Sequence, residues 1–383
     1  MKKTNRQILG EKSLILHKKN RGKIAISSKV KVKDMSDLSL VYTPGVGAVS
    51  SFLAKNKDKV REYTIKGNTV AVISDGSAVL GLGNIGPEGA LPVMEGKCLI
   101  FKEFANIDAF PIVLSTQNTE EIVTTIKALS ATFGGINIED ISAPRCFEIE
   151  DRLKKELDIP VMHDDQHGTA IIILAGLINA LKVVKKEIGK VKIVLSGAGA
   201  AGTAVTKLLI KAGVKNMIVV DSMGTIYIGR KDLNKEKKEI SKITNNKING
   251  SLKEVLIGAD VFIGVSAPNL VNRDMVNTMS KDAVVFALAN PTPEIMPSEA
   301  LLGGAVVVAT GRSDFPNQLN NAQVFPGIFR GLLDYNISSV TDDIKLRVAY
   351  AIAKLVSKPN AVNIVPGIFD KRLVNTVSKA VRG

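Results

Sequence analysis

The feature that most constrains the fold is a glycine-rich turn in the second half of the chain. An apolar segment, residues 191–195, runs into Ser-Gly-Ala-Gly-Ala-Ala-Gly over residues 196–202. A helical pattern over residues 203–212 and a second apolar segment, 217–221, follow. This is the Gly-x-Gly-x-x-Gly pattern between a strand and a helix that a dinucleotide-binding unit requires. It predicts a parallel sheet flanked by helices, with a dinucleotide at the N-terminus of the helix.

The three glycines of this turn have different tasks. Gly197 makes the turn, Gly199 lets the backbone approach the pyrophosphate, and Gly202 permits close packing of the helix on the strand. Asp221 lies about twenty residues further on, where an acidic side chain accepts the ribose hydroxyls. The predicted cofactor-binding residues are Gly197, Ala198, Gly199, Ala200, Ala201, Gly202, Asp221 and Asn290.

Asparagines follow later strands of the same predicted sheet. The apolar run 283–289 ends at Asn290, which a proline follows. Because ligands bind at the carboxyl ends of such strands, Asn290 is a candidate contact for cofactor or substrate, or else a loop asparagine before a proline turn. Asn320 and Asn321 precede an apolar helical segment, which they could cap, or they could face the cleft.

Two pairs of acidic residues occur in the first half of the chain. Glu139–Asp140 and Asp164–Asp165 each come just after a segment that we expect to be extended and buried. Carboxylates at the mouth of buried strands are costly unless they are paired or bind a metal. If the two pairs converge, they make an oxygen cage for Mg²⁺ or Mn²⁺; the alternative is a set of helix caps and surface acids.

Tyr42 and Lys97 each have a chemical interpretation and an ordinary one. Tyr42 precedes a Thr-Pro-Gly turn, where it could be a positioned proton donor or a packing residue. Lys97 stands before residues 98–101, which we predict to be a strand, so it lies at a strand edge. Burial there would lower the pKa of Lys97 and make it a usable base, whereas an ordinary surface lysine would have no such role.

The remaining pattern of the first half predicts alternating strands and helices. A glycine-rich loop over residues 75–86 resembles a nucleotide loop, but we expect no helix of the required type directly after it. We interpret it as a tight loop near the active site. We predict strands over residues 69–74, 98–101 and 109–114, and helices over residues 118–132, 146–157 and 169–184.

Length and charge limit the possible functions. With 383 residues the chain is long enough for two domains. The net charge of +14 comes from lysines spread along the chain, and there is no tryptophan to stack on bases, so we expect no nucleic-acid partner. A basic surface can instead steer an anionic substrate toward the protein.

The sequence gives no signal for secretion or membrane insertion. The apolar run 170–181 contains Asn179 and is too short to span a bilayer, so we predict a buried helix. The basic N-terminal segment lacks the apolar core of a signal peptide. Cys98 and Cys146 lack metal-type spacing and suit free thiols in a reducing compartment. We expect a cytoplasmic protein without a membrane partner.

A series of motifs occurs in a fixed order along roughly residues 38–335, and together they make the chain resemble the malic enzymes, in the short form of bacteria and some protists. The motifs are Tyr42-Thr-Pro-Gly-Val46, Val93-Met-Glu-Gly-Lys97, Gly135-Ile-Asn-Ile-Glu-Asp140, His163-Asp-Asp-Gln-His-Gly-Thr169, the Gly197 fingerprint, Ala289-Asn-Pro291 and Arg312-Ser-Asp-Phe-Pro-Asn317. The resemblance implies oxidative decarboxylation of (S)-malate to pyruvate and CO₂ with a nicotinamide cofactor.

The resemblance also implies roles for residues that the pattern singles out. Lys97 would take the C2 hydroxyl proton of malate, with Asp164 beside it to tune its pKa, while the hydride passes from C2 to the nicotinamide. Tyr42 would protonate C3 of enolpyruvate. The ligands of Mg²⁺ or Mn²⁺ would be Glu139, Asp140 and Asp165. The residues that hold malate or pyruvate would be Lys97, Asn290, Asn321 and, as a close competitor of Asn321, Asn320.

One departure from the family concerns the substrate. Larger malic enzymes place an arginine for a malate carboxylate in the loop that matches residues 77–80, and this sequence has none there. We expect Arg145, Arg312 or a group from another subunit to replace it.

The choice of cofactor follows from charge. Asp221 would repel the 2′-phosphate of NADP⁺, and no lysine follows it within residues 221–224, so we predict NAD⁺ over NADP⁺. Arg230 and Lys231 are near enough in sequence to change this, and NADP⁺ stays possible.

The predicted fold is α/β in two domains. Residues 1–165 would hold the metal and the acid–base residues, and residues 166–383 would form the Rossmann-type NAD-binding domain, with the active site in the cleft between them. We expect a homodimer, with an N-terminal arm over residues 1–40 able to make the interface. Two alternatives stay open: a malolactic-type enzyme that returns the hydride and releases lactate, and a catalytically silent NAD-binding regulator.

Overall fold

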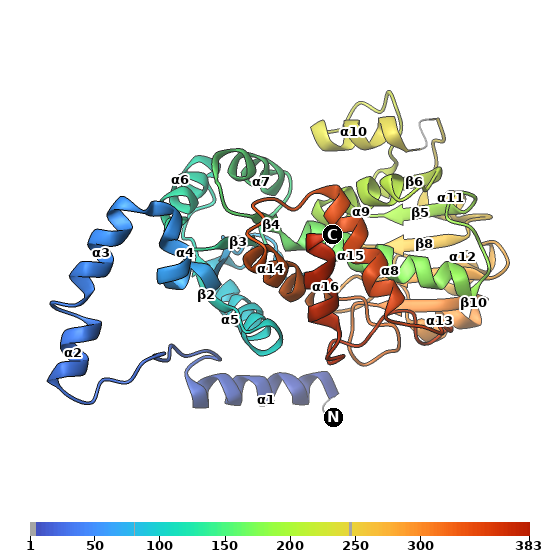
Figure 1. Ribbon diagram of the computed structural model, residues 1–383. Coiled ribbons are helices and arrows are strands. Elements are labelled where there is room, and N and C mark those ends of the chain that lie inside the picture. Colours follow the sequence, from blue (N-terminus) through green and yellow to red (C-terminus); the bar gives the residue numbers. More distant parts are fainter. Residues whose placement is uncertain (1–4, 80, 245–246) are drawn as a thin grey trace.

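The computed structural model of the protein describes residues 5–79, 81–244 and 247–383. Two sheets, each covered by helices, lie side by side, and an N-terminal arm extends beyond the first of them (Figure 1). The long helix α8, Asp164–Val183, leads from the first lobe into the second. The α/β fold class and the Rossmann-type second lobe that we predicted are confirmed.

Within the described residues, the first sheet has four parallel strands in the order β2-β1-β3-β4. The strands are β1 Thr69–Ser74, β2 Asp108–Val113, β3 Gly135–Ile138 and β4 Val161–His163. The helices that connect them are α5 Gly86–Ala105, α6 Thr119–Leu129 and α7 Arg145–Glu156. Helix α6 begins after Asn118, whose side chain accepts the backbone N–H groups of Glu120 and Glu121.

Residues 98–101 are helical, so our prediction of a strand there is wrong. They lie inside α5, which begins at Gly86 directly after the glycine-rich loop. The expectation that no helix follows this loop is therefore also wrong. The buried residues of α5 include Met94, Cys98 and Phe101, at the spacing of one helix face. A short apolar run suits a strand and a buried helix equally, and Lys97 in fact projects from a helix.

The second sheet carries the dinucleotide fingerprint. In the part of the chain that the structure describes, its six strands have the order β10-β9-β8-β5-β6-β7, and all pairs are parallel except β6 with β7. The order reverses beside β5, which places a ligand crevice at the carboxyl end of that strand. The strands are β5 Lys192–Ser196, β6 Asn216–Asp221, β7 Gly224–Thr225, β8 Val261–Gly264, β9 Ala283–Ala287 and β10 Ala305–Thr310.

Helix α8 lies in the centre of the molecule. Among the described helices it has the length and apolar composition of a membrane span, yet 72% of that apolar window is buried inside the protein. Asn179, in its middle, donates to the carbonyls of Ala353 and Ile364 at 2.8 and 2.9 Å, so its buried amide has partners. The predicted buried helix is confirmed, although it begins earlier than expected, at Asp164.

The remaining helices of the second lobe lie around its sheet, and the last ones return to the first lobe. Phe325 and Phe329 of α14 pack edge-on against Phe101 of α5, with ring centroids 4.7 and 5.4 Å apart. The division of the chain at residue 165 therefore stays a prediction. The helices are α9 Ala200–Lys211, α10 Lys235–Ile243, α11 Leu252–Leu256, α12 Arg273–Asn277, α13 Pro297–Leu302, η3 Asn321–Gln323, α14 Phe325–Asp334, α15 Asp342–Lys354 and α16 Leu373–Arg382.

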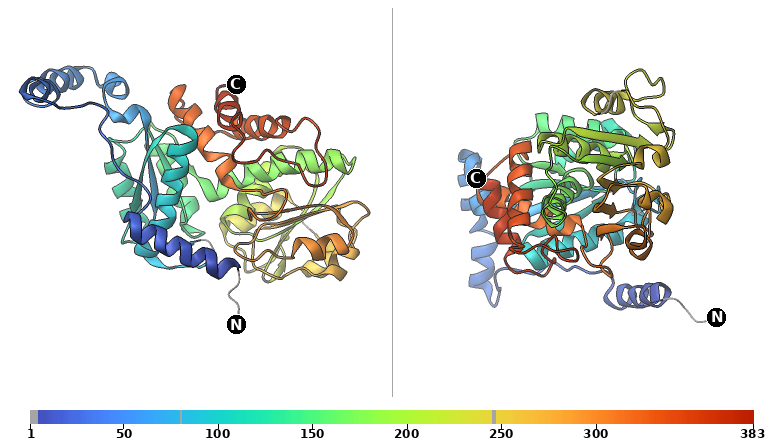
Figure 2. Two further views of the ribbon diagram at one scale, coloured as in Figure 1. Left: turned by 90° about the horizontal axis from the view of Figure 1, so that it is seen from below. Right: turned by 90° about the vertical axis from the view of Figure 1, so that its right-hand side faces the viewer.

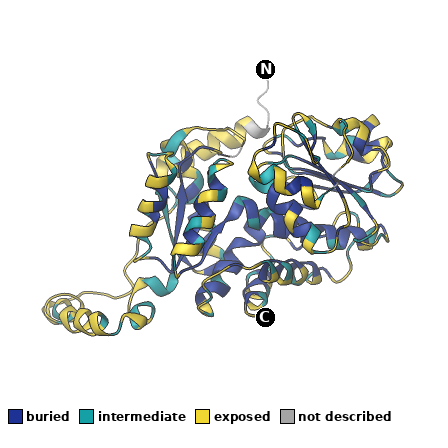
Figure 3. Cartoon of the chain, turned by 90° about the horizontal axis from the view of Figure 1, so that it is seen from above, coloured by how far each residue is buried: buried dark blue, intermediate teal, exposed yellow. Residues whose placement is uncertain are grey.

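The N-terminal arm is the most exposed part of the described chain. It contains α1 Asn5–Asn20, α2 Met35–Val41 and α3 Val46–Lys55, and neither α2 nor α3 has a buried residue. Figure 2 shows α2 and α3 standing away from the two lobes, and the arm is mostly yellow in Figure 3, in contrast to the dark-blue interior. The segments η1 Lys57–Lys59, α4 Val60–Tyr63 and η2 Ile65–Asn68 lead from the arm to β1.

Candidate active site

A buried lysine meets two carboxylates between the lobes. The Lys97 Nζ lies 2.6 Å from Oδ2 of Asp164 and 2.7 Å from Oε1 of Glu139, and at most 8% of any of these side chains is exposed. Glu139 follows β3, and Asp164 begins α8 directly after β4. Because β3 and β4 are parallel neighbours, both acids emerge at the same edge of the sheet. The expected contact between Lys97 and Asp164 is present.

The prediction that Lys97 has a lowered pKa is wrong for this arrangement. Burial alone would lower the pKa of Lys97, but the charges of Asp164 and Glu139 outweigh burial and raise it above its ordinary value. Burial raises the pKa of Asp164 to about 6, although the Lys97 charge opposes this shift. At neutral pH the pair is therefore an ammonium group facing a carboxylate.

Glu139, Asp140 and Asp165 come together as the sequence predicts. One oxygen of each lies within 4.8 Å of the others. The loop between β3 and α7 contacts α8 here, because the backbone N–H of Asp140 donates to Oδ2 of Asp165 at 2.8 Å. Asp140 has a left-handed φ of 52° at this point. Carboxylates this close repel each other unless protons or a cation intervene. A set of oxygen donors alone fits a hard divalent cation such as Mg²⁺ or Mn²⁺.

A fifth carboxylate, which sequence reasoning missed, holds the start of α8 in place. Glu150 of α7 is buried, and its Oε1 accepts the backbone N–H of His163 at 2.9 Å, while its Oε2 accepts the Gln166 side chain at 3.1 Å. Lys154 and His167 lie within 3.0 Å of the same carboxylate. Burial alone would raise the pKa of Glu150, but His167 and Lys154 outweigh burial and hold it well below 4.5. One buried charge thus fixes the turn that carries Asp164 and Asp165.

A cavity of about 820 Å³ lies over the lysine and the metal-binding candidates. Asn290, Asn320 and Asn321 of the second lobe line it, together with Lys97. Asn320 also caps η3, because its side chain accepts the backbone N–H of Ala322 at 2.9 Å. Asn320 is thus a cavity residue and a cap, but it caps η3 and not the apolar helix α14 as we expected, since the N-cap of α14 is Val324.

Tyr42 is not brought to this cavity. It directly follows α2, which lies at the outer end of the arm (Figure 1). Tyr42 is 66% exposed, and it is not among the described residues that line the cavity. Within one chain, the predicted proton donor and the predicted base are thus in different places.

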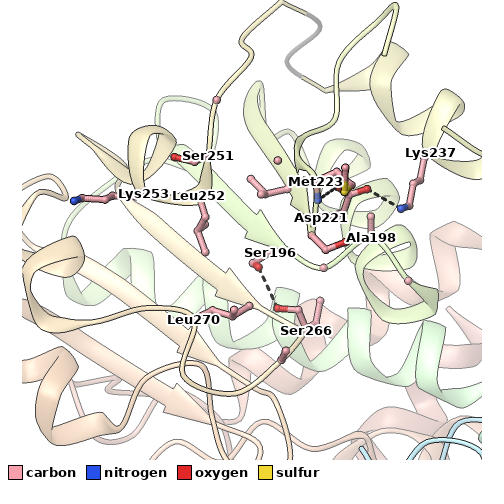
Figure 4. A pocket seen from close by; sticks show the side chains of 18 of the residues that line it. Ser196, Ala198, Asp221, Met223, Lys237, Ser251, Leu252, Lys253, Ser266 and Leu270 are labelled. Atoms are coloured by element: carbon pink, nitrogen blue, oxygen red, sulfur yellow. Dashed lines mark hydrogen bonds and ion pairs between the residues drawn. The ribbon is translucent and has the colours of Figure 1, made fainter. Parts of the chain in front are cut away.

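A second cavity, of about 1260 Å³, adjoins the first at the glycine-rich turn. Gly197, Ala198 and Gly199 line it, with Asp221 at the end of β6 (Figure 4). Ala200 and Ala201, at the start of α9, line the first cavity. Gly202 lines neither and has the packing role that we predicted, since a Cβ there would lie 1.7 Å from the Gly197 carbonyl oxygen.

The surroundings of Asp221 differ from what the sequence indicates. Its Oδ2 accepts from Arg230 Nη2 and from Lys237 Nζ, both at 2.7 Å, and its Oδ1 accepts the backbone N–H of Met223 at 2.9 Å. Burial alone would raise the pKa of Asp221, but these hydrogen bonds lower it. Arg230 was a candidate from the sequence, whereas the second cation is Lys237 rather than Lys231.

Neither arginine that we considered for the substrate reaches the first cavity. Arg145 pairs with Asp75 at 3.0 Å, and Arg312 pairs with Asp314 at 2.6 Å. Neither is among the described residues that line the cavity. Leu80, in the loop that lacks the family's arginine, lies outside the described residues.

Comparisons with known proteins cover almost the whole chain. A family model for the malic enzyme N-terminal domain matches residues 19–122 and 115–154, and one for the malic enzyme NAD-binding domain matches residues 166–381.

Curated and solved relatives agree with these matches. The chain is 54% identical over 377 residues to the bifunctional malic/malolactic enzyme of Bacillus subtilis, covering 97% of this chain and 92% of that protein. It is 54% identical over 363 residues to the NAD-dependent malic enzyme of Geobacillus stearothermophilus, covering 94% of this chain and 76% of that one. The crystal structure of an NAD-dependent malic enzyme from Thermotoga maritima is 48% identical with a TM-score of 0.94, covering 97% of this chain and 99% of that one.

Proposed function

The chain belongs to the malic enzyme family. We propose which of its residues act in each step of the oxidative decarboxylation of malate to pyruvate and CO₂ with reduction of NAD⁺. The observation that carries the proposal is the position of Lys97, buried against Asp164 and Glu139 beside a three-carboxylate cluster and next to the dinucleotide turn. A silent regulator has no need of this constellation.

Lys97 is the proposed base. It takes the proton of the C2 hydroxyl group while the hydride leaves C2 for the nicotinamide, and Asp164 orients its Nζ. This role requires a neutral amine at the moment of transfer. A Glu139 carboxylate engaged by a cation would attract the Lys97 proton less, so one of the charges that raise the pKa of Lys97 would be weakened while that of Asp164 stays.

Glu139, Asp140 and Asp165 are the proposed ligands of Mg²⁺ or Mn²⁺. When bound, such a cation supplies a Lewis acid for the negative charge that develops on the substrate oxygen during decarboxylation. Asn290, Asn320 and Asn321 border the same cavity and supply amide groups that bind and orient malate. The N-terminus of α9 would hold the pyrophosphate of NAD⁺, and Asp221 would bind the ribose hydroxyls.

We place Tyr42 in the active site of a second copy of the chain. Its exposed ring and the exposed apolar side chains around it, such as Leu40 at 74% and Met35 at 73%, form a surface that a monomer would leave in water. A homodimer with two-fold symmetry covers both arms in the same way and brings Tyr42 of the partner subunit to the Lys97 cavity. There it protonates C3 of the enolpyruvate that decarboxylation leaves.

The test is NADH formation at 340 nm with purified protein, malate, NAD⁺ and Mn²⁺. We expect a steady rise with pyruvate as product, and a fall in kcat of about 10²–10⁴-fold in Lys97→Ala. The Lys97→Ala variant should keep its affinity for NADH, since Lys97 does not line the cofactor cavity. An unchanged kcat in this variant would remove Lys97 from the mechanism.

A malolactic activity is the second candidate, because the Bacillus subtilis relative is named for both reactions. In that case the hydride returns to C2 of pyruvate, and lactate accumulates without net NADH. Chromatography of the products of the same reaction separates the two, since pyruvate with stoichiometric NADH indicates the oxidative reaction and lactate without NADH the malolactic one.

A further inference from the structure

The negative charges in the substrate cavity outnumber the positive charges once malate is bound. Malate carries two carboxylates, and the protein presents four more around Lys97, at Glu139, Asp140, Asp164 and Asp165. The Lys97 ammonium group is already paired with two of these acids. Lys97 and one divalent cation together leave the cluster with an excess negative charge, so a dianion needs a further cation to bind.

Lys23 supplies this cation. Of the described residues that line the cavity, the lysines and arginines are Lys23 and Lys97. The Lys23 Nζ donates to the Pro92 carbonyl of α5 at 2.6 Å. A Cβ on Gly96, the neighbour of Lys97, would lie 3.2 Å from the same Nζ, so the glycine leaves the space that the amine occupies. An ammonium group has three donors, and one bond to a carbonyl leaves two for a ligand.

The segment that carries Lys23 is held against α5. The Lys23 backbone N–H donates to Oε2 of Glu95 at 3.2 Å. Gly22 has a left-handed φ of 110°, and a Cβ there would lie 2.8 Å from Oε1 of Glu95, so the turn needs glycine at this point. Ser13 and His17, in the preceding helix α1, also line the cavity. The end of α1 and the turn after it thus form one wall of the site.

We propose that Lys23 binds the C4 carboxylate of malate, the one that leaves as CO₂. The inference rests on the proposed function for the identity of the substrate, and on the contacts of Lys23 for the position of the charge. Arg145 and Arg312 do not compete for this role, because both are paired with acids outside the cavity.

The chemistry of the step predicts which kinetic constant depends on Lys23. Once hydride loss has made C2 a ketone, the C3–C4 bond breaks, its electron pair forms the C2–C3 double bond of an enolate with the charge on the C2 oxygen, and C4 departs as neutral CO₂. The charge that pairs with Lys23 disappears in this step. Lys23 therefore stabilises bound malate more than the transition state, so its loss raises KM and does not lower kcat.

The test compares Lys23→Met with Lys66→Met in the full-length protein with NAD⁺ and Mn²⁺. Lys66 is a matched control, because its Nζ also donates to backbone carbonyls, those of Ser130 and Ala131, and because burial lowers the pKa of both lysines. We expect Lys23→Met to raise KM for malate at least about tenfold, the range of a charged hydrogen bond, and to change kcat less than about threefold. Lys23→Arg should restore KM, and Lys66→Met should leave it unchanged.

The second readout is oxamate, which resembles pyruvate and has no second carboxylate. Its inhibition constant should be the same in wild type and Lys23→Met. An unchanged KM for malate, or equal weakening of malate and oxamate, would overturn the proposal. Calorimetry can measure the binding of malate to the NADH–Mn²⁺ complex without turnover. If Lys23→Met weakens this binding but the wild-type protein does not oxidise malate, the proposed function is contradicted while the role of Lys23 stands.

Discussion

At the scale of single residues, neighbours decide what a charged side chain does. Asp221 stands where an acid selects NAD⁺ by repelling a 2′-phosphate, yet Arg230 and Lys237 offset most of its charge. Lys237 also lines the cofactor cavity, with its amine directed at Asp221 (Figure 4). Discrimination against NADP⁺ then requires that Arg230 and Lys237 stay paired with Asp221, so that neither is available to bind a 2′-phosphate.

Asp221→Asn should shift the preference toward NADP⁺. The change removes the negative charge and frees Lys237 to bind a 2′-phosphate, so we expect the ratio of kcat/KM for NADP⁺ to that for NAD⁺ to rise at least about tenfold. Initial rates at 340 nm with both cofactors measure this ratio.

Asp232→Asn is the control for this experiment. Asp232 also pairs with Arg230, at 2.7 Å, but it does not line the cofactor cavity, and the ratio should stay within about twofold of wild type. Equal ratios in Asp221→Asn and wild type would show that Asp221 does not set cofactor choice.

At the scale of elements, the junction of β4 and α8 holds the site together. Strand β4 is short, and Asp164 and Asp165 stand in the first turn of α8, where acids interact well with the helix dipole. Glu150 of α7 ties this junction down from outside the cavity, by accepting from the backbone of His163 and the side chain of Gln166. Glu150 thus holds the first turn of α8 on one side. On the other side Asp164 reaches Lys97, and Asp165 lies beside Glu139 and Asp140.

Glu150→Gln should destabilise the fold by about 3 kcal/mol at pH 7, because Lys154 and the buried polar groups lose a paired charge. The native state holds the pKa of Glu150 well below the ordinary 4.5. A carboxylate of this kind stabilises the fold fully above pH 4.5, and its contribution is lost as the pH falls through the native pKa. Urea unfolding at pH 7 and pH 4 should therefore show a smaller difference between wild type and variant at pH 4.

Glu148→Gln is the control, because it removes an exposed carboxylate from the same helix. It shows whether loss of any charge from α7 changes the free energy of unfolding. The Glu148 side chain is 60% exposed, and its change should shift the free energy of unfolding by less than about 0.5 kcal/mol. A Glu150→Gln variant as stable as Glu148→Gln would mean that the tie between α7 and α8 contributes little.

At the scale of the whole molecule, the N-terminal arm leaves apolar side chains exposed when the chain is taken alone. Helices α2 and α3 bury no residue, and the views in Figure 1 and Figure 2 agree that they lie away from both lobes. The base and the proposed proton donor are correspondingly far apart. An assembly of two chains resolves both points at once, since each arm can cover apolar surface and deliver Tyr42 to the other subunit.

Mixing two inactive variants tests this arrangement. Tyr42→Phe and Lys97→Ala should each be nearly inactive alone. After random exchange of subunits, half of the dimers are hybrids, and each hybrid has one site with both residues intact, so we expect about a quarter of wild-type activity. NADH formation by the mixture measures it. A mixture as inactive as its components would place Tyr42 and Lys97 in the same subunit.

Much of the fold follows from local pattern. The fingerprint around Gly197 requires a strand, a turn with positive φ and a helix, and the close contact of Gly202 with the Gly197 carbonyl joins residues close in sequence. The acid pairs had two interpretations in the sequence, and the structure decides between them: β3 and β4 are parallel neighbours, so the acids after them lie at one edge of the sheet.

Local pattern thus accounts for the α/β class, for the dinucleotide turn with its flanking strand and helix, and for acids that follow two buried strands. The folded structure was needed to show that residues 98–101 are helical, that two ion pairs raise the pKa of Lys97, and that Lys23 faces the substrate cavity. It also placed Tyr42 away from the site. The reason is that burial, ion pairing and distance depend on contacts between segments far apart in the chain, which no local pattern records.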